Sequence, residues 1–433
     1  MKSPSHISAS SGFFACTLLT IILITASSMA AQEKVLHYFG AKPALNPAAP
    51  LISDAAGNLY GTTGIGGNVG SCPQAPHICG TVFKLERTSS GFRYRLPYIF
   101  KGGSDGDDPQ GGLVFDTAGN LYGSTLNGGS KTCFGQPYGC GTIFELAPTS
   151  HGWSETVIHR FASDGSDGAL PTGSLTVDAS GNLYGTTFGG GGSSCFGFGC
   201  GTVFELSPGS NGWTETVLYS FAGGSDGDAP QGNLIFDTKG NLYGVAGRGG
   251  VTNGICPDGC GVVFELTPQA GGGWTQTVVY SFTGGSDGAF PSSGVILDAQ
   301  DNLYGTAAGG GATACTNGCG TVFELSPSGS GWNFSTLYGF SGSDGDLPVG
   351  IVLAPSGDLF GATEFAGSGG WGNVFKLVPG SGTWTETVLH QFTGGKDGGQ
   401  PPAGVILDTA GNLYGTTFDG GASDWGVVFE ITP

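Results

Sequence analysis

The sequence predicts an all-β protein, a seven-bladed β-propeller of four-stranded blades, from three observations. The segment Asp-x-x-Gly-Asn-Leu-Tyr-Gly recurs seven times with slight variation, at intervals of about 60 residues. Each copy carries the same short strand-like segments, and the two ends of the chain complement one another. Such a sustained period is typical of one supersecondary unit copied until neighbouring copies bury each other's faces. The aromatic residue of the signature falls at Tyr60, Tyr122, Tyr184, Tyr243, Tyr304, Phe360 and Tyr414.

Four predicted strands occur in the same order in every repeat. They are rich in Val, Ile, Thr, Tyr and Phe and are bounded by Gly, Pro, Ser and Asp, which is the signal for strands and turns. The second strand is the signature itself. The first strand is an apolar run before it, as at 113–115, 234–236, 295–297 and 405–407. The third strand is centred on an aromatic residue and spans 81–85, 142–146, 202–206, 262–266, 321–325, 373–377 and 427–431.

The fourth strand has the form Glu-Thr-Val-Leu-Tyr-Ser-Phe. It ends at Phe39, Phe100, Phe161, Phe221, Phe282, Phe340 and Phe392. The turn from first to second strand, as at 116–120, starts with Asp and places Gly where a positive φ is needed. The turn from third to fourth strand carries Gly shortly before an aromatic residue, at Phe92, Trp153, Trp213, Trp274, Trp332 and Trp384. The seventh repeat lacks this turn.

The ends of the chain distinguish a closed ring from an open solenoid. The chain starts with an unpaired fourth strand, 35–39, and stops at Pro433, directly after the seventh third strand. A solenoid needs polar caps at its ends, whereas a ring of blades leaves no long exposed edge when these pieces pair. We therefore expect residues 31–433 to form a single propeller. Its strand 35–39 completes the blade formed by about 403–433.

Residues 1–30 have the features of a signal peptide. Lys2 precedes an apolar stretch from Phe13 to Thr25, and Ser28-Met29-Ala30 is a small-x-small cleavage site. The apolar stretch is short for a membrane span, and the rest of the chain has none. The sequence therefore predicts a secreted or extracellular protein, with the cell surface or periplasm as other destinations. An uncleaved N-terminal anchor is the alternative.

The charge of the chain excludes some partners. Its formal net charge is −19 at pH 7. A surface this acidic repels nucleic acid and anionic lipid. We expect a soluble monomer with no nucleic-acid partner and no membrane span after signal cleavage.

The ten cysteines of the mature chain fall in five pairs between second and third strands. The pairs are Cys72 with Cys79, Cys133 with Cys140, Cys195 with Cys200, Cys256 with Cys260, and Cys315 with Cys319. In repeats six and seven both members are missing together, which favours pairing in space. An exported chain makes disulfides the natural state. A metal site is the disfavoured alternative, because it needs further ligands and only the first pair has a nearby His, His77.

Histidine and serine patterns do not indicate catalysis. His37, His159 and His390 occupy one repeat position where other repeats carry Tyr, so we interpret it as an amphipathic aromatic packed between blades. Gly-x-Ser-x-Gly matches, such as 102–106, lie in loops without a following helix, which excludes a nucleophile elbow. The sequence supplies no catalytic residue.

The loop from the fourth strand to the next first strand is the candidate binding segment. It supplies Asp105, Asp107, Asp167, Asp226, Asp228, Asp287, Asp344, Asp346 and Asp397. We expect it on the same face as the cysteine pairs, and function usually lies on loops held by a rigid scaffold. Carboxylates in this arrangement can hold Ca²⁺ or hydrogen-bond a sugar. For any single Asp the favoured interpretation is that Asp-Gly simply makes the turn. No other cofactor and no confident metal site is predicted.

The repeats also resemble a known family. Gly-Asn-Leu-Tyr-Gly-Thr-Thr at 181–187 and 411–417, and Cys-Gly-Thr-Val-Phe-Glu-Leu at 200–206 followed by Ser-Pro-Gly, resemble the GloVer-type tandem repeats of bacterial "choice-of-anchor" exported proteins. The resemblance covers essentially all of the mature chain and implies surface or extracellular residence. The ending Ile431-Thr432-Pro433 carries no sorting tail, which favours release. The Asp-x-x-Gly-Asn turn is more loosely similar to NHL-type and gluconolactonase-type propellers.

Two functions follow from these patterns. The favoured one is a secreted, non-enzymatic binding or adhesion propeller whose Asp-rich loop face contacts an extracellular polysaccharide or protein. The alternative is a propeller-type hydrolase or lyase, lactonase-like or acting on polysaccharide, with its site at the axial mouth. The near-identity of the repeats and the lack of an acid, base and nucleophile set favour binding. Fold alone does not choose.

Overall fold

The computed structural model divides the chain into two compact units, Met1–Ala30 and Ala31–Pro433. It describes Met1 and residues 31–433, except 41–43, 68–78, 131, 163–164, 166, 193–194, 196, 330 and 367–368. The predicted signal peptide therefore lies outside the described residues. Within the described part, no helix is long and apolar enough to span a membrane.

The second unit is all β, and the strands of each repeat pair antiparallel in chain order. Repeat 1 contributes β2 (Ala44–Pro47), β3 (Ile52–Ser53), β4 (Leu59–Gly66), β5 (Thr81–Thr88) and β6 (Gly91–Ile99). Repeat 2 contributes a short 3₁₀ turn, η1 (Gly103–Asp105), then β7 (Val114–Phe115), β8 (Leu121–Thr125), β9 (Thr142–Thr149) and β10 (Gly152–Arg160). Repeat 3 contributes β11 (Gly168–Pro171), β12 (Thr176–Val177), β13 (Leu183–Gly190), β14 (Thr202–Gly209) and β15 (Gly212–Ser220).

The remaining repeats follow the same plan. Repeat 4 contributes β16 (Asp228–Phe236), β17 (Leu242–Arg248), β18 (Val262–Pro268) and β19 (Trp274–Ser281). Repeat 5 contributes β20 (Ala289–Leu297), β21 (Leu303–Gly309), β22 (Thr321–Ser328) and β23 (Gly331–Gly339). Repeat 6 contributes β24 (Asp346–Leu353), β25 (Leu359–Phe365), β26 (Asn373–Pro379) and β27 (Trp384–Gln391). Repeat 7 contributes β28 (Ile406–Leu407), β29 (Leu413–Thr417) and β30 (Val427–Thr432).

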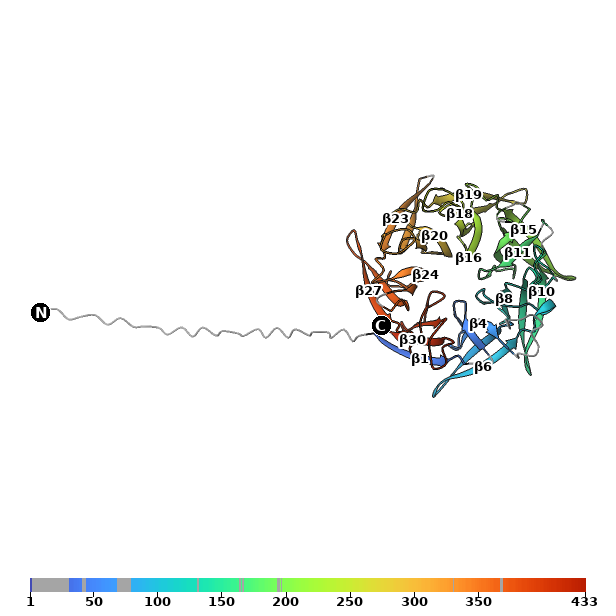
Figure 1. Ribbon diagram of the computed structural model, residues 1–433, viewed down its shortest axis with the longest axis horizontal. Coiled ribbons are helices and arrows are strands. Elements are labelled where there is room, and N and C mark those ends of the chain that lie inside the picture. Colours follow the sequence, from blue (N-terminus) through green and yellow to red (C-terminus); the bar gives the residue numbers. More distant parts are fainter. Residues whose placement is uncertain are drawn as a thin grey trace. The chain divides into compact units, whose positions relative to one another are not determined.

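The N-terminal strand completes the last sheet. Strand β1 (Gln32–Tyr38) pairs antiparallel with β30, with Glu33 opposite Ile431 and Tyr38 opposite Val427. The sheet order is therefore β1-β30-β29-β28. In Figure 1 the sheets of this unit follow one another around a common centre, and β1 (blue) lies beside β30 (red). The predicted pairing of the two ends is confirmed.

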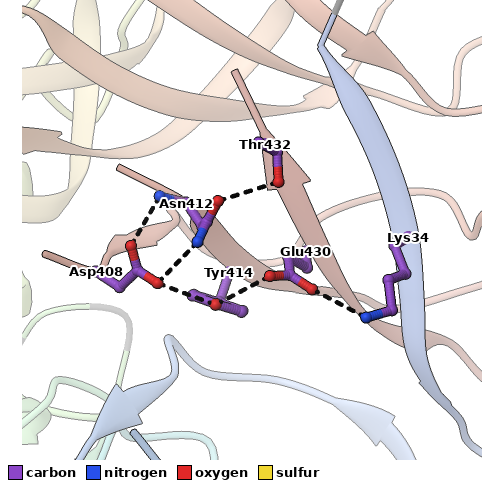
Figure 2. Close-up of polar contacts among 6 residues, drawn as sticks. All are labelled: Lys34, Asp408, Asn412, Tyr414, Glu430 and Thr432. Atoms are coloured by element: carbon purple, nitrogen blue, oxygen red, sulfur yellow. Dashed lines mark hydrogen bonds and ion pairs between the residues drawn. The ribbon is translucent and has the colours of Figure 1, made fainter. Parts of the chain in front are cut away.

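The repeated signature forms a hydrogen-bonded network at the turn between first and second strands. Figure 2 shows it in the last sheet, where Oδ2 of Asp408 accepts hydrogen bonds from Nδ2 of Asn412 (3.0 Å) and the hydroxyl of Tyr414 (3.1 Å). Tyr414 also lies 3.1 Å from Oε1 of Glu430 on the third strand. Lys34 of β1 reaches the other oxygen of Glu430 at 3.4 Å. The signature thus fixes one turn and ties three strands together.

The glycine after the signature tyrosine is required by core packing. A Cβ added at Gly123 would lie 2.6 Å from Cζ of Phe144 on the third strand. Phe144 is fully buried and packs edge to face on Phe100, the residue directly after the preceding fourth strand β6, at 5.0 Å between centroids. Phe39 packs on Phe83 in the same way at 5.2 Å. The N-terminal strand therefore fills the core position that a fourth strand fills elsewhere.

Strand lengths differ from the sequence-based expectation at both ends of the repeat. The third strands run one to three residues further than expected, and in repeats 1 to 6 the pairing with the fourth strand continues beyond the expected end, as at Pro148 opposite Trp153. The first strands are uneven. β7 has two residues, whereas β16 begins at Asp228 and absorbs an irregularity between Gln231 and Ile235.

Candidate functional site

Disulfides close the loops between second and third strands. Four of the predicted pairs are bonded, namely Cys133–Cys140, Cys195–Cys200, Cys256–Cys260 and Cys315–Cys319. Cys79 is also disulfide-bonded, and its predicted partner Cys72 lies outside the described residues. Near two of these disulfides, Asp228 and Asp346 each place a carboxylate oxygen within 4.8 Å of the sulfurs. Oxidised sulfur is not a thiolate ligand, so the disulfide interpretation prevails over the metal one.

An indole replaces the disulfide in repeat 6. In repeats 3 and 4 the disulfide sulfurs fill the space beside a turn glycine, Gly223 or Gly284. At the matching glycine, Gly394, an added Cβ would instead lie 2.3 Å from Cε2 of Trp371. The two cysteines are missing together because one large aromatic side chain occupies the volume of the pair.

Most of the candidate carboxylates are engaged by their own turns. Oδ2 of Asp287 accepts the hydroxyl of Tyr280 (3.0 Å) and the backbone N–H of Thr283 (2.7 Å). Oδ1 of Asp287 accepts the hydroxyl of Thr283 (2.6 Å) and the backbone N–H of Gly285 (3.1 Å). The same pattern of turn N–H and aromatic partner recurs, in part or in full, at Asp105, Asp167, Asp226, Asp344 and Asp397. These groups act as turn formers, while their use as ligands stays a prediction.

The His or Tyr position of the fourth strand has a polar role that sequence reasoning missed. Its polar tip reaches the carboxylate about seven residues later, as Tyr98 to Asp105 at 2.7 Å and His390 Nε2 to Asp397 Oδ2 at 3.3 Å. Burial lowers the pKa of His390 against the opposing charge of Asp397. His37 differs, because it stacks on Tyr94 at 4.0 Å between centroids. The constant spacing from aromatic to Asp was the available signal.

The remaining candidates, Asp107, Asp228 and Asp346, stand at or near the start of the next first strand. Burial, and then the charge of Asp108, raises the pKa of Asp107 to about 7. Burial also raises the pKa of Asp228, where the Arg248 guanidinium opposes the shift, and that of Asp346. Asp107 and Asp228 are 9% and 4% exposed. They therefore offer little surface to a ligand in solution.

The Asp turns and the disulfide loops lie against each other. The backbone N–H of Gly250, after a second strand, donates to the carbonyl of Gly224 in the Asp turn (3.0 Å), and Gly311 donates to Gly285 in the next repeat (2.7 Å). We call the surface made by both sets of loops the loop face. It comprises the described residues of the disulfide loops, 133–140, 195, 197–200, 256–260 and 315–319, and the Asp turns 102–109, 223–230, 284–291, 342–348 and 394–401.

The loop face also presents exposed apolar side chains. Tyr138 and Phe198 lie in the disulfide loops of repeats 2 and 3, and Ile255 directly precedes the disulfide-bonded Cys256 of repeat 4; the three side chains are 49%, 40% and 54% exposed. Phe198 packs edge to face on Phe134 of the preceding repeat, at 5.5 Å between centroids. The disulfides hold Tyr138 and Phe198 on short closed loops and fix the residue next to Ile255.

A cavity at the centre of the repeats is the main feature that the sequence did not reveal. It has a volume of about 360 Å³, and every repeat contributes two to five residues to its wall. Most of them follow the proline that ends the Asp turn, as Gln110 follows Pro109 and Gln231 follows Pro230. The residue before this proline has a positive φ in all seven repeats, namely Asn46, Asp108, Leu170, Ala229, Phe290, Leu347 and Gln400. A residue in the left-handed backbone conformation at this point turns the chain toward the centre of the repeats.

Glycines let neighbouring first strands approach at the cavity wall. A Cβ on Gly173 would lie 2.1 Å from the carbonyl oxygen of Gly232, and one on Gly232 would lie 2.3 Å from the backbone nitrogen of Gly294. A side chain at these positions would separate the repeats. In a chain with 86 glycines, this requirement does not stand out from the sequence.

Comparison with known families identifies the repeat. A family model for the Gloeobacter/Verrucomicrobia repeat matches residues 20–198, 130–315 and 312–433. The resemblance to GloVer-type repeats is confirmed. No curated protein matches the chain.

Solved structures with low sequence identity share the fold. The extracellular domain of a candidate hybrid two-component system from B. thetaiotaomicron matches with a TM-score of 0.53 at 11% identity; the match covers 92% of this chain but only 39% of that one. Candidate 6-phosphogluconolactonases from Bacteroides uniformis and Bacteroides fragilis match with TM-scores of 0.51 and 0.50 at 12% and 13% identity. These two matches cover 84% of this chain and 98% and 97% of theirs. At such identities the likeness is one of fold.

Proposed function

This chain belongs to the Gloeobacter/Verrucomicrobia repeat family, and from that premise we propose that it is a secreted binding or adhesion protein without catalytic activity. Its loop face contacts an extracellular polysaccharide or protein. Residues 1–30 serve as the signal peptide, and the mature chain acts as a monomer. The four disulfide bonds indicate an extracytoplasmic protein, because such bonds persist in oxidising compartments.

The seven repeats are the blades of one closed propeller. Six hydrogen-bonded sheets contain the described strands, and the eight-stranded one joins two four-stranded units through a single pairing of Asn233 with Gly294. The pairing of β1 with β30 supplies the fourth strand of the last unit. The contribution of all seven repeats to one central cavity supports the same count.

The chemistry of the central cavity is the observation that carries the proposal. A hydrolase or lyase needs a general acid, base or nucleophile where its substrate binds. The cavity is lined by described residues, and none of them is Asp, Glu, His, Cys, Lys or Arg. Tyr304, the one phenol in the wall, donates to Asp298 (3.2 Å) or Glu324 (3.3 Å), and burial raises its pKa. The alternative enzymatic function would require a site outside this cavity.

The loop face is the better contact surface. Tyr138, Phe198 and Ile255 expose apolar area on loops pinned by disulfides, so binding them costs little conformational entropy. Tyr and Phe rings suit both the C–H face of a sugar and a protein side chain. The carboxylates beneath them hold the turns in place.

A binding screen run beside a turnover panel tests this function. The mature chain is applied to a glycan array and, in parallel, incubated with lactones and polysaccharides. We expect retention on at least one glycan, or on a protein ligand, and no turnover. Sustained hydrolysis or elimination by the purified protein would favour the enzymatic alternative.

Substitutions on the loop face locate the contact. The pair Tyr138→Ser and Phe198→Ser should weaken retention at least tenfold. Val378→Ser is the matched control, because Val378 is 37% exposed but lies at the end of β26, away from the disulfide loops. Equal retention by both variants would remove the loop face from the proposal.

A further inference from the structure

The wall of the central cavity is chemically divided between two groups of repeats. Repeats 2 to 5 contribute a polar arc, made of Gln110, Thr172, Ser174, Gln231, Asn233 and Ser292, and repeat 5 adds Ile296 and Tyr304 where this arc meets the next repeat. Repeats 6, 7 and 1 contribute an apolar arc, made of Ala48, Pro50, Val349, Ile351, Pro402 and Ala403. Because the sheets follow one another in chain order and β1 joins the last sheet, each arc is continuous (Figure 1). The cavity therefore has one polar side and one apolar side.

This division is not required by the fold. The residues occupy matching positions after the turn proline, and the repeats are otherwise nearly alike. A wall that served only to close the ring could be equally apolar or equally small in every repeat. Gln and Asn on one side and Val, Ile and Pro on the other indicate a surface fitted to something with two unlike sides.

The polar arc has unused hydrogen-bonding capacity. Ser174 is engaged, since its Oγ accepts the backbone N–H of Gly112 (3.1 Å). Within the described part of the chain, the side-chain amides of Gln231 and Asn233 line the cavity and make no hydrogen bond. Gly247 leaves room for the side-chain amide of Gln231, because a Cβ added to Gly247 would lie only 2.3 Å from Nε2 of Gln231. An amide supplies both donors and an acceptor, so each can bind one or more hydroxyl groups.

The cavity selects against charge. No ionic side chain lines it, so a phosphate, carboxylate or ammonium placed there would be partly desolvated without a counter-charge. The net charge of −19 adds a repulsive field for anions. The volume of about 360 Å³ falls in the range of roughly 300–1,000 Å³ typical of small-molecule sites.

The geometry points to a second binding site, in which the central cavity takes a neutral, polyhydroxylated ligand of one or two sugar units. The hydroxyl groups face the polar arc, and a C–H face of the ring packs on the apolar arc. This inference goes beyond the proposed function, because it assigns a site separate from the loop face and a class of ligand.

Calorimetric titration of the mature chain tests the site with named probes. Glucose, maltose and cellobiose are the neutral probes; glucose 6-phosphate and galacturonate are the charged ones. We expect saturable binding of at least one neutral sugar and at least tenfold weaker binding of its charged counterpart. No binding of any neutral probe, or equal binding of the charged ones, would overturn the inference.

Variants place the binding in the cavity. The double variant Gln231→Leu, Asn233→Leu keeps side-chain size but removes both amides, and should weaken sugar binding at least tenfold. Ser292→Trp fills the cavity from the polar arc and should abolish it. Gln269→Leu, an exposed amide on the β18–β19 turn, is the matched control and should bind as the native chain does. Thermal melting confirms that each variant is folded.

The outcomes separate this inference from the proposed function. Sugar binding that the double variant leaves unchanged, but that Tyr138→Ser with Phe198→Ser abolishes, would move the sugar to the loop face. That result would overturn the cavity site and leave the binding function standing. Binding lost only in the cavity variants would establish the site even where the loop face proves inert.

Discussion

The ring of Tyr414 packs edge to face near the ring of Phe92, with 6.4 Å between centroids, although the two residues belong to the last and first repeats. The same contact joins neighbouring repeats elsewhere, as Tyr122 with Trp213 at 5.7 Å and Tyr243 with Trp332 at 5.8 Å. The signature tyrosine of one repeat thus meets the hairpin aromatic of the next. The first and last repeats are therefore in contact as ordinary neighbours.

Removing the N-terminal strand should open this contact. Deleting residues 32–38 removes β1, leaves the edge of β30 unpaired and takes away the register that aligns Glu33 with Ile431. We expect a lower midpoint and a broader, less cooperative transition in thermal or denaturant unfolding. The mature chain, residues 31–433, is the reference for the comparison. An unchanged melting curve after deletion of β1 would contradict the closed arrangement.

The strands and their closure could be predicted because they follow a repeating apolar pattern. Alternation and turn residues located the third strand at 142–146, and the structure extends it to Thr149. The missing part contains Pro148, a residue that strand rules exclude except at an edge or bulge. Pairing with the fourth strand across a tight hairpin overrides that preference.

The candidate site was less predictable, for two physical reasons. Asp287 and its counterparts were visible as acidic residues in loops, but their engagement by Tyr280 and by turn N–H groups depends on local geometry. The central cavity depends on the departure of each repeat from the others just after the turn proline. Such differences, as between Gln231 and Val349, carry no periodic signal and become a site only when the repeats meet.

Asp287 should matter for stability and not for calcium. Its carboxylate accepts four hydrogen bonds in its turn, so Asp287→Ala should cost about 2–3 kcal/mol in the free energy of unfolding. Millimolar Ca²⁺ should leave the melting temperature of the native chain unchanged, because these oxygens are already occupied.

Asp258→Ala is the control for this prediction. Asp258 is an exposed carboxylate in the disulfide loop 256–260, and its loss should change the free energy of unfolding by less than about 0.5 kcal/mol. A calcium-dependent rise in melting temperature that Asp287→Ala abolishes would support the carboxylates as a cation site instead.

Stability should fall as the pH rises from about 4.5 to about 7. Burial, and then the charge of Asp105, raises the pKa of Glu155 from an ordinary value of 4.5 to about 7; burial and Asp344 do the same for Glu386. A raised carboxyl pKa means that the folded state binds more protons than the unfolded chain across this window. The contribution is complete below about pH 4.5 and is lost by about pH 7. Denaturant unfolding across this range measures it.

An internal comparison isolates the carboxyl groups. The matching position in another repeat is Gln276, whose Nε2 donates to the carbonyl of Asp226 (3.1 Å), so an amide fits there. Glu155→Gln combined with Glu386→Gln should flatten the dependence of stability on pH, and Gln276→Glu should steepen it. Profiles that stay parallel to the native one would exclude these groups as its source.

Trp371 and each disulfide should add a similar amount to the free energy of unfolding. Only the contribution of the disulfides should be lost on reduction. The indole fills the space beside Gly394 that disulfide sulfurs fill beside Gly223, so Trp371→Ala should cost about 2–3 kcal/mol through the void it leaves. Replacing Cys315 and Cys319 by Ala, which removes a loop closure of sequence separation 4, should cost about 2 kcal/mol in the free energy of unfolding.

Denaturant unfolding with and without a phosphine reductant separates the effect of the indole from that of the disulfides. The native chain and Trp371→Ala should lose the same increment on reduction, and the cysteine variant should lose less. Loss of reductant sensitivity in Trp371→Ala would show that the indole supports the neighbouring disulfides and is not their substitute.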